Sequence, residues 1–167
     1  MKKTLLLFIS TLIVSVPVFA QRGVPTFAQY RVRVEKITPK PANLSSHKNA
    51  RMYRTNLRNA VKEGINFGGH FILTNWGCGT NCNEGAIIDA RTGRVFFPKE
   101  LGGFSIGQGE WSYDLEVIDF KANSTLIAIN GYSGGYLNHD DPAEGIYYYQ
   151  WTGTAFKKIG FVKKDRN

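Results

Sequence analysis

NFGGHFILTNWGCGTNCNEGAIIDARTGRVFF, residues 66–97, is the stretch that decides the fold. Within it, residues 69–76 and 85–90 are rich in β-branched, leucine and aromatic residues and predict two strands. A tight turn at residues 91–94 leads from the second strand into a third at residues 95–97. We therefore expect antiparallel hairpins, because each strand follows the last after a short connection.

The first twenty residues have the pattern of a secretory signal peptide. Two lysines begin it, residues 5–16 form an apolar run, and Val18-Phe19-Ala20 matches a cleavage site. The alternative is an uncleaved anchor, but the run is shorter than the roughly 20 residues that span a bilayer. We therefore expect cleavage after Ala20, a single globular domain over residues 21–167, and a periplasmic or secreted location.

The two cysteines, Cys78 and Cys82, lie in the loop between the first two strands of this stretch. A disulfide is the default for neighbouring cysteines in an exported protein. A redox dithiol lacks the thioredoxin spacing, and a metal site of both thiolates and His70 lacks a fourth ligand. A nucleophilic cysteine with His70 and Asp89 needs a free thiolate, which a disulfide removes. We expect a structural disulfide, no metal ion and no cofactor.

The rest of the chain predicts one helix and further hairpins. A strand at residues 30–34 precedes the helix, and short turns join the pairs 114–120 with 124–130 and 146–151 with 155–162. Sequential hairpins form antiparallel sheet, and one helix is enough to cover one face. We expect an α+β domain, with one N-terminal amphipathic helix packed on a mainly antiparallel, meandering and strongly bent sheet or open barrel of about seven to eight strands. A β-sandwich is the second choice.

The helix is predicted over residues 47–63, with Ser45 or Ser46 as its N-terminal cap and Gly64 just past its end. Apolar residues recur at three- and four-residue spacing and mark a buried face. Another face carries basic residues at the same spacing, here called the basic stripe: Arg51, Arg54, Arg58 and Lys62. The basic stripe is either a solvated helix face or a docking surface for an anionic polymer or an acidic partner.

Charge is divided unevenly along the chain. Residues 21–62 hold ten Lys or Arg and one acid, residues 63–156 hold four and eleven, and residues 157–167 hold five and one. A basic total in an exported protein favours an anionic envelope polymer or an envelope protein as partner. The alternative is that the basic N-terminal part lies on the acidic middle part. Export argues against nucleic acid, and no segment after the leader is apolar enough to form a transmembrane span.

A long polar loop is predicted over residues 131–144. Residues 138–141, Asn-His-Asp-Asp, together with Glu144 place three carboxylates and an imidazole close together in the sequence. Their spacing lacks the alternating oxygens and central glycine of a calcium loop, so a solvated acidic loop is the better interpretation. The candidate binding residues of this region are Tyr132, Tyr136 and His139.

Two further patterns admit a functional interpretation. Asp114 and Glu116 share one face of a predicted strand and resemble a glycosidase acid pair, although a wet sheet face explains them equally well. With His70, they are the candidate catalytic residues. A second pattern is an aromatic face, suited either to stacking on sugar rings or to cross-strand packing: Tyr147, Tyr149 and Trp151.

The segments NFGGHF, WGCGTNC and IIDARTGRV, within residues 51–97, resemble a group of small exported bacterial proteins of uncharacterised function. This resemblance implies no activity. Ser133-Gly134-Gly135-Tyr136 is similar to the Ser-Gly-x-x-Tyr loop of bacterial periplasmic lysozyme inhibitors. The tyrosine arrives one residue early, and Leu137 holds the expected place. The resemblance implies an inhibitor, although a basic protein suits a cationic lysozyme badly.

These observations favour a non-catalytic exported binding protein of the bacterial cell envelope. The first alternative is an inhibitor or immunity-like protein that occludes an envelope hydrolase through the long loop. The second is an envelope hydrolase that uses His70 or the pair of Asp114 and Glu116. The position of His70 relative to the cysteines and the long loop discriminates between chemistry and binding, because a catalytic set must converge on one pocket.

Overall fold

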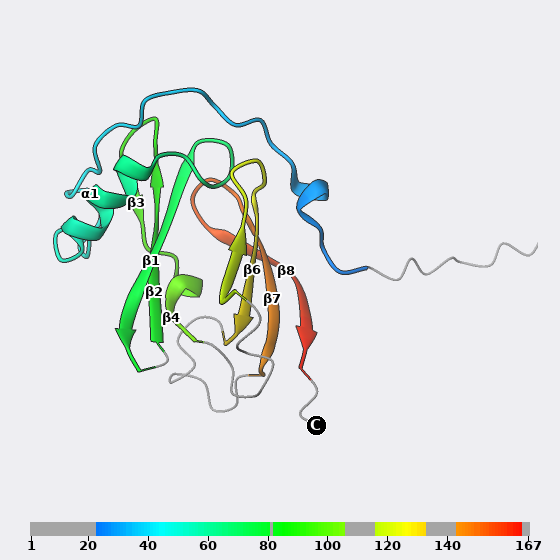
Figure 1. The fold of residues 1–167 in the computed structure, drawn as a ribbon. Coiled ribbons are helices and arrows are strands. Elements are labelled where there is room, and N and C mark those ends of the chain that lie inside the picture. The colour runs from blue at the N-terminus through cyan, green and yellow to red at the C-terminus, as the bar shows by residue number, and fades with distance from the viewer. Residues whose placement is uncertain (1–22, 81, 106–115, 133–142, 165–167) are drawn as a thin grey trace, which may run out of the picture.

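The computed structural model describes residues 23–80, 82–105, 116–132 and 143–164 (Figure 1). Within these residues the chain forms one α-helix, two 3-10 helices and eight strands. In chain order they are η1 (Phe27–Tyr30), α1 (Arg54–Glu63), β1 (Phe71–Gly79), β2 (Cys82–Asp89), β3 (Val95–Phe96), η2 (Lys99–Leu101), β4 (Gly102–Phe104), β5 (Ile118–Phe120), β6 (Leu126–Gly131), β7 (Gly145–Trp151) and β8 (Phe156–Lys163). No helix among the described residues is long and apolar enough to cross a bilayer.

The strands form two antiparallel sheets of four strands each. In the first sheet, β1 and β2 form the hairpin predicted from residues 66–97, and their pairing runs from Phe71 opposite Asp89 to Gly79 opposite Cys82. Both β3 and β4 pair with β2. In the second sheet, β5, β6, β7 and β8 follow one another as a meander. Within the described residues, the predicted succession of hairpins is confirmed.

The helix and the two sheets form three layers (Figure 1). Phe71 and Leu73 of β1 join Trp151 of the second sheet in a buried cluster between the sheets. Ile72 faces the other way and packs with Leu57 of α1 in a second cluster. Each such fully buried side chain contributes about 1.5–3 kcal/mol of hydrophobic free energy. The first sheet is therefore the middle layer, and successive side chains at the start of β1 face opposite layers.

The mainly antiparallel α+β class is confirmed, but the division of the strands differs from our first choice. The eight described strands lie in two sheets rather than in one strongly bent sheet, and the described residues close no barrel. A single antiparallel bridge between Ser105 and Tyr132 joins the sheets at one corner. The reason is burial: with apolar residues on both faces of β1, the second sheet covers the face that α1 leaves free.

The helix is shorter than predicted, and it does not lie at the N-terminus of the domain. It begins at Arg54, about two turns later than expected. Neither predicted serine caps it, because the N-cap residue is Tyr53, which makes no side-chain cap hydrogen bond. The Oγ atom of Ser46 instead accepts the backbone N–H of Val95 at 2.9 Å, which ties the preceding turns to β3. Gly64, with φ of 92°, ends the helix as predicted.

The strand predicted at residues 30–34 is wrong. Its first residue ends η1, and Arg31 forms only an isolated bridge with Ser124. Farther along, the N–H of Glu35 donates to the carbonyl oxygen of Gly69 at 2.8 Å. These hydrogen bonds reach separate turns rather than one neighbouring strand, so residues 31–35 form an extended connection and no strand.

Candidate functional site

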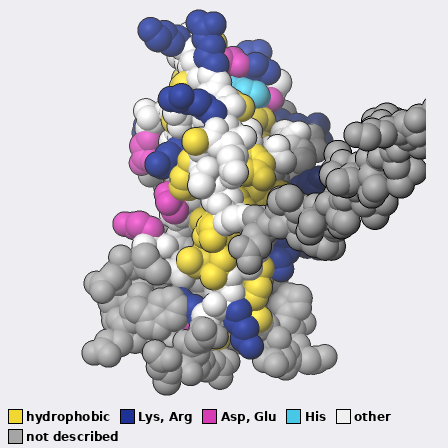
Figure 2. Space-filling model, turned by 90° about the vertical axis from the view of Figure 1, so that its right-hand side faces the viewer, with side chains coloured by type: hydrophobic (Ala, Val, Ile, Leu, Met, Phe, Trp, Pro, Cys, Tyr) yellow, Lys and Arg dark blue, Asp and Glu magenta, His cyan; other side chains and the backbone are white. Residues whose placement is uncertain are grey.

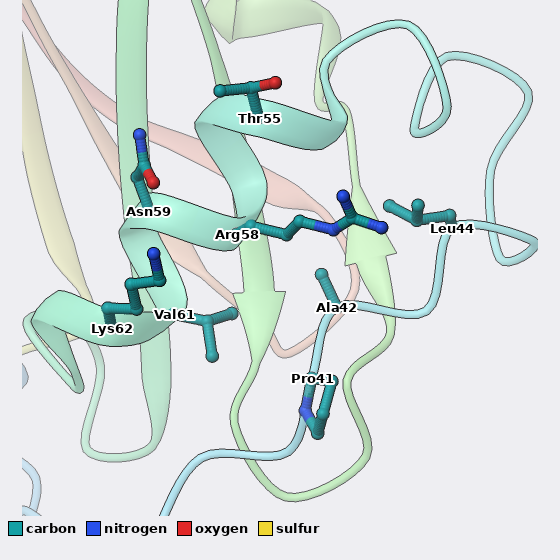
Figure 3. Close-up of a pocket in the computed structure, with 8 residues that line it drawn as sticks. All are labelled: Pro41, Ala42, Leu44, Thr55, Arg58, Asn59, Val61 and Lys62. Atoms are coloured by element: carbon teal, nitrogen blue, oxygen red, sulfur yellow. The ribbon is translucent and has the colours of Figure 1, made fainter.

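A groove lies between α1 and the extended segment that precedes it (Figure 3). Its volume is about 420 Å³, and we call it the basic groove. It is lined by eight residues: Pro41, Ala42, Leu44, Thr55, Arg58, Asn59, Val61 and Lys62. Two of these carry positive charge, two are neutral and polar, four are apolar, and none of the eight is acidic. In Figure 3, Arg58 extends from α1 toward Leu44, and Val61 points toward Ala42.

The turn between β2 and β3 holds the extended wall of the basic groove, residues 41–44. The N–H of Asn43 donates to the carbonyl oxygen of Gly93 at 2.8 Å. Gly93 has φ of 77°, and a Cβ atom built there would lie 2.2 Å from the carbonyl oxygen of Pro41. Only glycine permits both this backbone conformation and this approach. Side chains of the same wall pack against the buried cluster of α1, so both walls are fixed by the core.

All four residues of the basic stripe are exposed. Two of them, Arg58 and Lys62, line the basic groove. Arg54 lies outside it and donates to the carbonyl oxygen of Arg51 at 3.5 Å. Within residues 23–80, 82–105, 116–132 and 143–164, the ion pairs that form do not include any member of the stripe. The positive charge of the stripe therefore has no acidic partner in the described part of the chain. The alternative, in which the acidic middle part of the chain neutralises the basic N-terminal part, does not account for the stripe among these residues.

The structure separates His70 from the cysteines. Cys78 and Cys82 form the predicted disulfide, with their Cα atoms 5.1 Å apart. His70 immediately precedes β1, whereas the disulfide closes the opposite end of the β1–β2 hairpin. Eight residues of strand at about 3.3 Å each put roughly 26 Å between them. A metal set or a catalytic set that combines His70 with these cysteines is therefore excluded, and the described residues contain no cluster of three His, Cys, Asp or Glu side chains able to hold a metal ion.

His70 belongs to a charge network that the sequence did not reveal. Its Nδ1 atom lies 3.7 Å from Oε1 of Glu35. Arg91 donates from both Nε, at 3.0 Å, and a terminal nitrogen to the same carboxylate. The Arg91 hydrogen bond holds the pKa of Glu35 below its usual value. Burial, with a smaller effect of the Arg91 charge, lowers the pKa of His70. The network joins three segments that are distant in sequence, and a catalytic role of His70 stays a prediction.

The other candidate residues are not brought together within the described structure. Glu116 is exposed, while Asp114, Tyr136 and His139 lie outside the described residues. Tyr132 is half-buried, and its hydroxyl donates to Oε2 of the Glu144 carboxylate at 3.3 Å. The acid-pair and inhibitor hypotheses therefore stay predictions.

A buried ionic pair lies where β7 begins and β8 ends. Glu144 and Lys164 are 94% and 96% buried by side chain, and their charged atoms lie 3.5 Å apart. This corrects the prediction of a solvated acidic loop at Glu144. The sequence gives a weak indication of this pair, because Glu144 immediately precedes β7 and Lys164 immediately follows β8. These two strands are antiparallel, with Gly145 opposite Lys163. Residues just beyond such a pair face each other.

The aromatic face of β7 packs into the hydrophobic core between the two sheets. Tyr149 and Trp151 belong to the cluster between the sheets, and Tyr147 packs against it. Their rings are engaged by neighbours such as Phe156, whose centroid lies 5.1 Å from that of Trp151. Cross-strand packing therefore explains this face, and stacking on sugar rings does not.

A second basic cleft, of about 570 Å³, lies between the N-terminal segment and β8. It is lined by Gly23, Pro25, Gln29, Tyr30, Lys157, Lys158 and Ile159. Figure 2 shows the face of the molecule on the side of β8: hydrophobic side chains occupy its middle, and Lys and Arg side chains lie at its upper end, at its sides and near its lower end. The cleft ends at the first described residue, so the basic groove at α1 is the better-defined site.

No protein-family model, no curated protein and no solved structure matches this chain. The chemistry of the site therefore rests on its own residues. Two cations that have no acidic partner among the described residues lie here beside an apolar wall, and they attract an anion that also carries apolar groups. The lining of the basic groove supplies neither a nucleophile with its base nor an acidic group.

Proposed function

We propose that this chain is a non-catalytic exported binding protein of the bacterial cell envelope, and that the basic groove and the adjoining basic stripe hold an anionic ligand. The observation that carries the proposal is that the exposed stripe lies beside a groove and has no acidic partner in the part of the chain that the structure describes. Isolated surface charges are usually solvated and contribute little. Here two of them line a concave site with apolar walls, where a bound anion is partly removed from water and attracted more strongly.

Export is the second part of the proposal. It rests on the signal-peptide pattern of residues 1–20 and is compatible with a disulfide in a small domain. Disulfides persist in oxidising compartments such as the periplasm. In that compartment the abundant anionic ligands are envelope polymers and the acidic surfaces of envelope proteins.

Cosedimentation with purified peptidoglycan tests the polymer form of the proposal. We expect residues 21–167 to pellet with the polymer at low salt and to be released as salt screens the charges. The double substitution of Arg58→Ala and Lys62→Ala should reduce the pelleted fraction severalfold. A matched control, Arg33→Ala with Lys36→Ala, removes the same charge from exposed positions that do not line the groove.

Two results would count against the polymer form: no retention of the wild-type chain, or equal retention of the groove variant and the control. If only total charge matters, the two double variants should behave alike. A difference between them assigns the binding to the basic groove.

A further inference from the structure

We infer that the basic groove binds an extended acidic segment of a partner polypeptide, with carboxylates at alternate positions and small apolar side chains between them. This inference rests on the proposed function, since it requires the groove to be an anion site. It goes further by stating the conformation of the ligand and the spacing of its charges.

The two cations of the groove set the spacing. Arg58 and Lys62 are four residues apart on α1, so their Cβ atoms lie about 5–6 Å apart along the helix face. In an extended peptide, alternate side chains project to the same side at about 6.6 Å, which is two residues of strand rise. In Figure 3 Arg58 extends toward Leu44, whereas Lys62 points toward Asn59. Both side chains are exposed and free to turn, so carboxylates at positions i and i+2 meet the two cations when both turn toward the peptide. Adjacent carboxylates project to opposite sides and do not.

The opposite wall accounts for the residue between the acids. While carboxylates face α1, the intervening side chain of an extended peptide faces the other wall, formed by Pro41, Ala42 and Leu44. Figure 3 shows these residues along the segment beside the helix, with Leu44 near the end of the Arg58 side chain. This wall is apolar and carries no charge, so it favours a small apolar side chain.

The chemistry of the two cations supports a carboxylate ligand. A guanidinium matches the two oxygens of a carboxylate through parallel hydrogen bonds, which Arg58 is free to form at the exposed end of its side chain. Lys62 adds a point charge that tolerates a less exact geometry.

A polypeptide fits the lining better than a glycan. Only Thr55 and Asn59 offer neutral hydrogen-bonding side chains, and no aromatic ring lines the groove. A hydroxyl-rich sugar chain would therefore lose hydrogen bonds to water against the four apolar residues. At about 420 Å³, the groove also lies in the range of pockets that hold a small ligand, so it takes a few residues of chain.

Two labelled peptides of equal composition provide the test. One alternates aspartate and alanine, and the other has the same residues with its aspartates adjacent; both are acetylated and amidated. By fluorescence anisotropy with residues 21–167, we expect the alternating peptide to bind at least tenfold more tightly. Arg58→Ala and Lys62→Ala should each abolish that preference, whereas the double control at Arg33 and Lys36 should retain it.

A charge-reversal variant keeps the test decisive even if the alanine variants fail to fold. The double variant Arg58→Glu with Lys62→Glu should bind an alternating lysine–alanine peptide and reject the aspartate peptide. This gain of binding requires a folded groove, so it supports the inference independently of the alanine variants. If the reversed protein retains its fold by circular dichroism and shows no preference for the lysine peptide, the inference is overturned.

The remaining outcomes separate this inference from the proposed function. Equal affinity for both aspartate peptides, still dependent on Arg58, leaves the groove as an anion site and overturns the spacing. Groove-dependent retention on peptidoglycan without peptide binding leaves the proposed function and overturns the peptide ligand. Binding to phosphatidylglycerol vesicles alone assigns the groove to a membrane surface and also overturns it. No binding to any of these probes overturns both.

Discussion

Glu144 and Lys164 form an ion pair across 3.5 Å in which both side chains are more than nine-tenths buried. Their backbones are joined as well, because the N–H of Lys164 donates to the carbonyl oxygen of Glu144 at 2.9 Å. Tyr132 donates to the second carboxylate oxygen. The pair therefore joins the end of β8 to the start of β7.

Breaking this pair from one side should be costly. Lys164→Met leaves the Glu144 carboxylate buried without its cation, and we expect the free energy of unfolding to fall by about 3–5 kcal/mol. Replacing both residues, as in Glu144→Gln with Lys164→Met, should cost clearly less, since no lone charge remains. Chemical denaturation measures both. Equal losses in the single and double variants would show that the charges are not coupled.

Gly93 does not line the basic groove, but it should determine the position of the groove wall formed by residues 41–44. Gly93→Ala strains a residue with φ of 77° and drives a Cβ atom into the Pro41 carbonyl oxygen. We expect a loss of about 2–3 kcal/mol in the free energy of unfolding and, because the extended wall is displaced, weaker binding of the alternating peptide. Gly153→Ala is the matched control, with positive φ but no atom within 4 Å of the added Cβ. Its binding should be unchanged, and similar binding defects in both variants would contradict the role of the wall.

The sequence predicts the hairpins well and the helix start poorly, for a physical reason. Alternation along β1 is a local property, and it was enough to sort Phe71 from Ile72 into different core clusters. Capping by Ser46 is also local, but its hydroxyl is used by Val95, which is 49 positions away. Local signals fail where a tertiary hydrogen bond competes for the same group.

Only one wall of the basic groove could be predicted from the sequence. Helical spacing identified Arg58 and Lys62, but nothing local indicated that residues 41–44 would lie opposite them. That wall depends on the approach of Pro41 to Gly93, between positions far apart in the chain. The Glu35–Arg91 ion pair could not be predicted for the same reason, because only the fold brings these two residues together.

The disulfide should stabilise the fold only modestly. Cys78 and Cys82 close a short loop at the tip of a hairpin that is already paired. The loop-entropy relation gives about 2 kcal/mol for a ring of this size. Cys78→Ala with Cys82→Ala should therefore unfold in one cooperative transition at lower denaturant, with its β-sheet circular dichroism retained. A chain that fails to fold without the disulfide would show that the hairpin depends on it.

His70 should make the stability depend on pH between neutrality and weak acid. Burial, and then the charge of Arg91, lower its pKa below 6.5, and Asp89 and Glu35 oppose this only in part. The unfolded chain therefore binds a proton at a higher pH than the folded chain does, so the free energy of unfolding falls as the pH drops below about 6.5. Glu35, whose pKa is lowered by Arg91, contributes stability above its ordinary value of 4.5 that is lost as the pH falls through its lower folded pKa.

The variants His70→Gln and Glu35→Gln should separate these two windows. His70→Gln should flatten the dependence between about pH 6.5 and 5 while keeping the loss in stronger acid. In Glu35→Gln, the loss in stronger acid should shrink. Denaturation midpoints measured at half-unit steps of pH report both effects. If His70→Gln follows the wild-type curve down to pH 5, then the half-buried imidazole does not carry the dependence, and another group must titrate in its place.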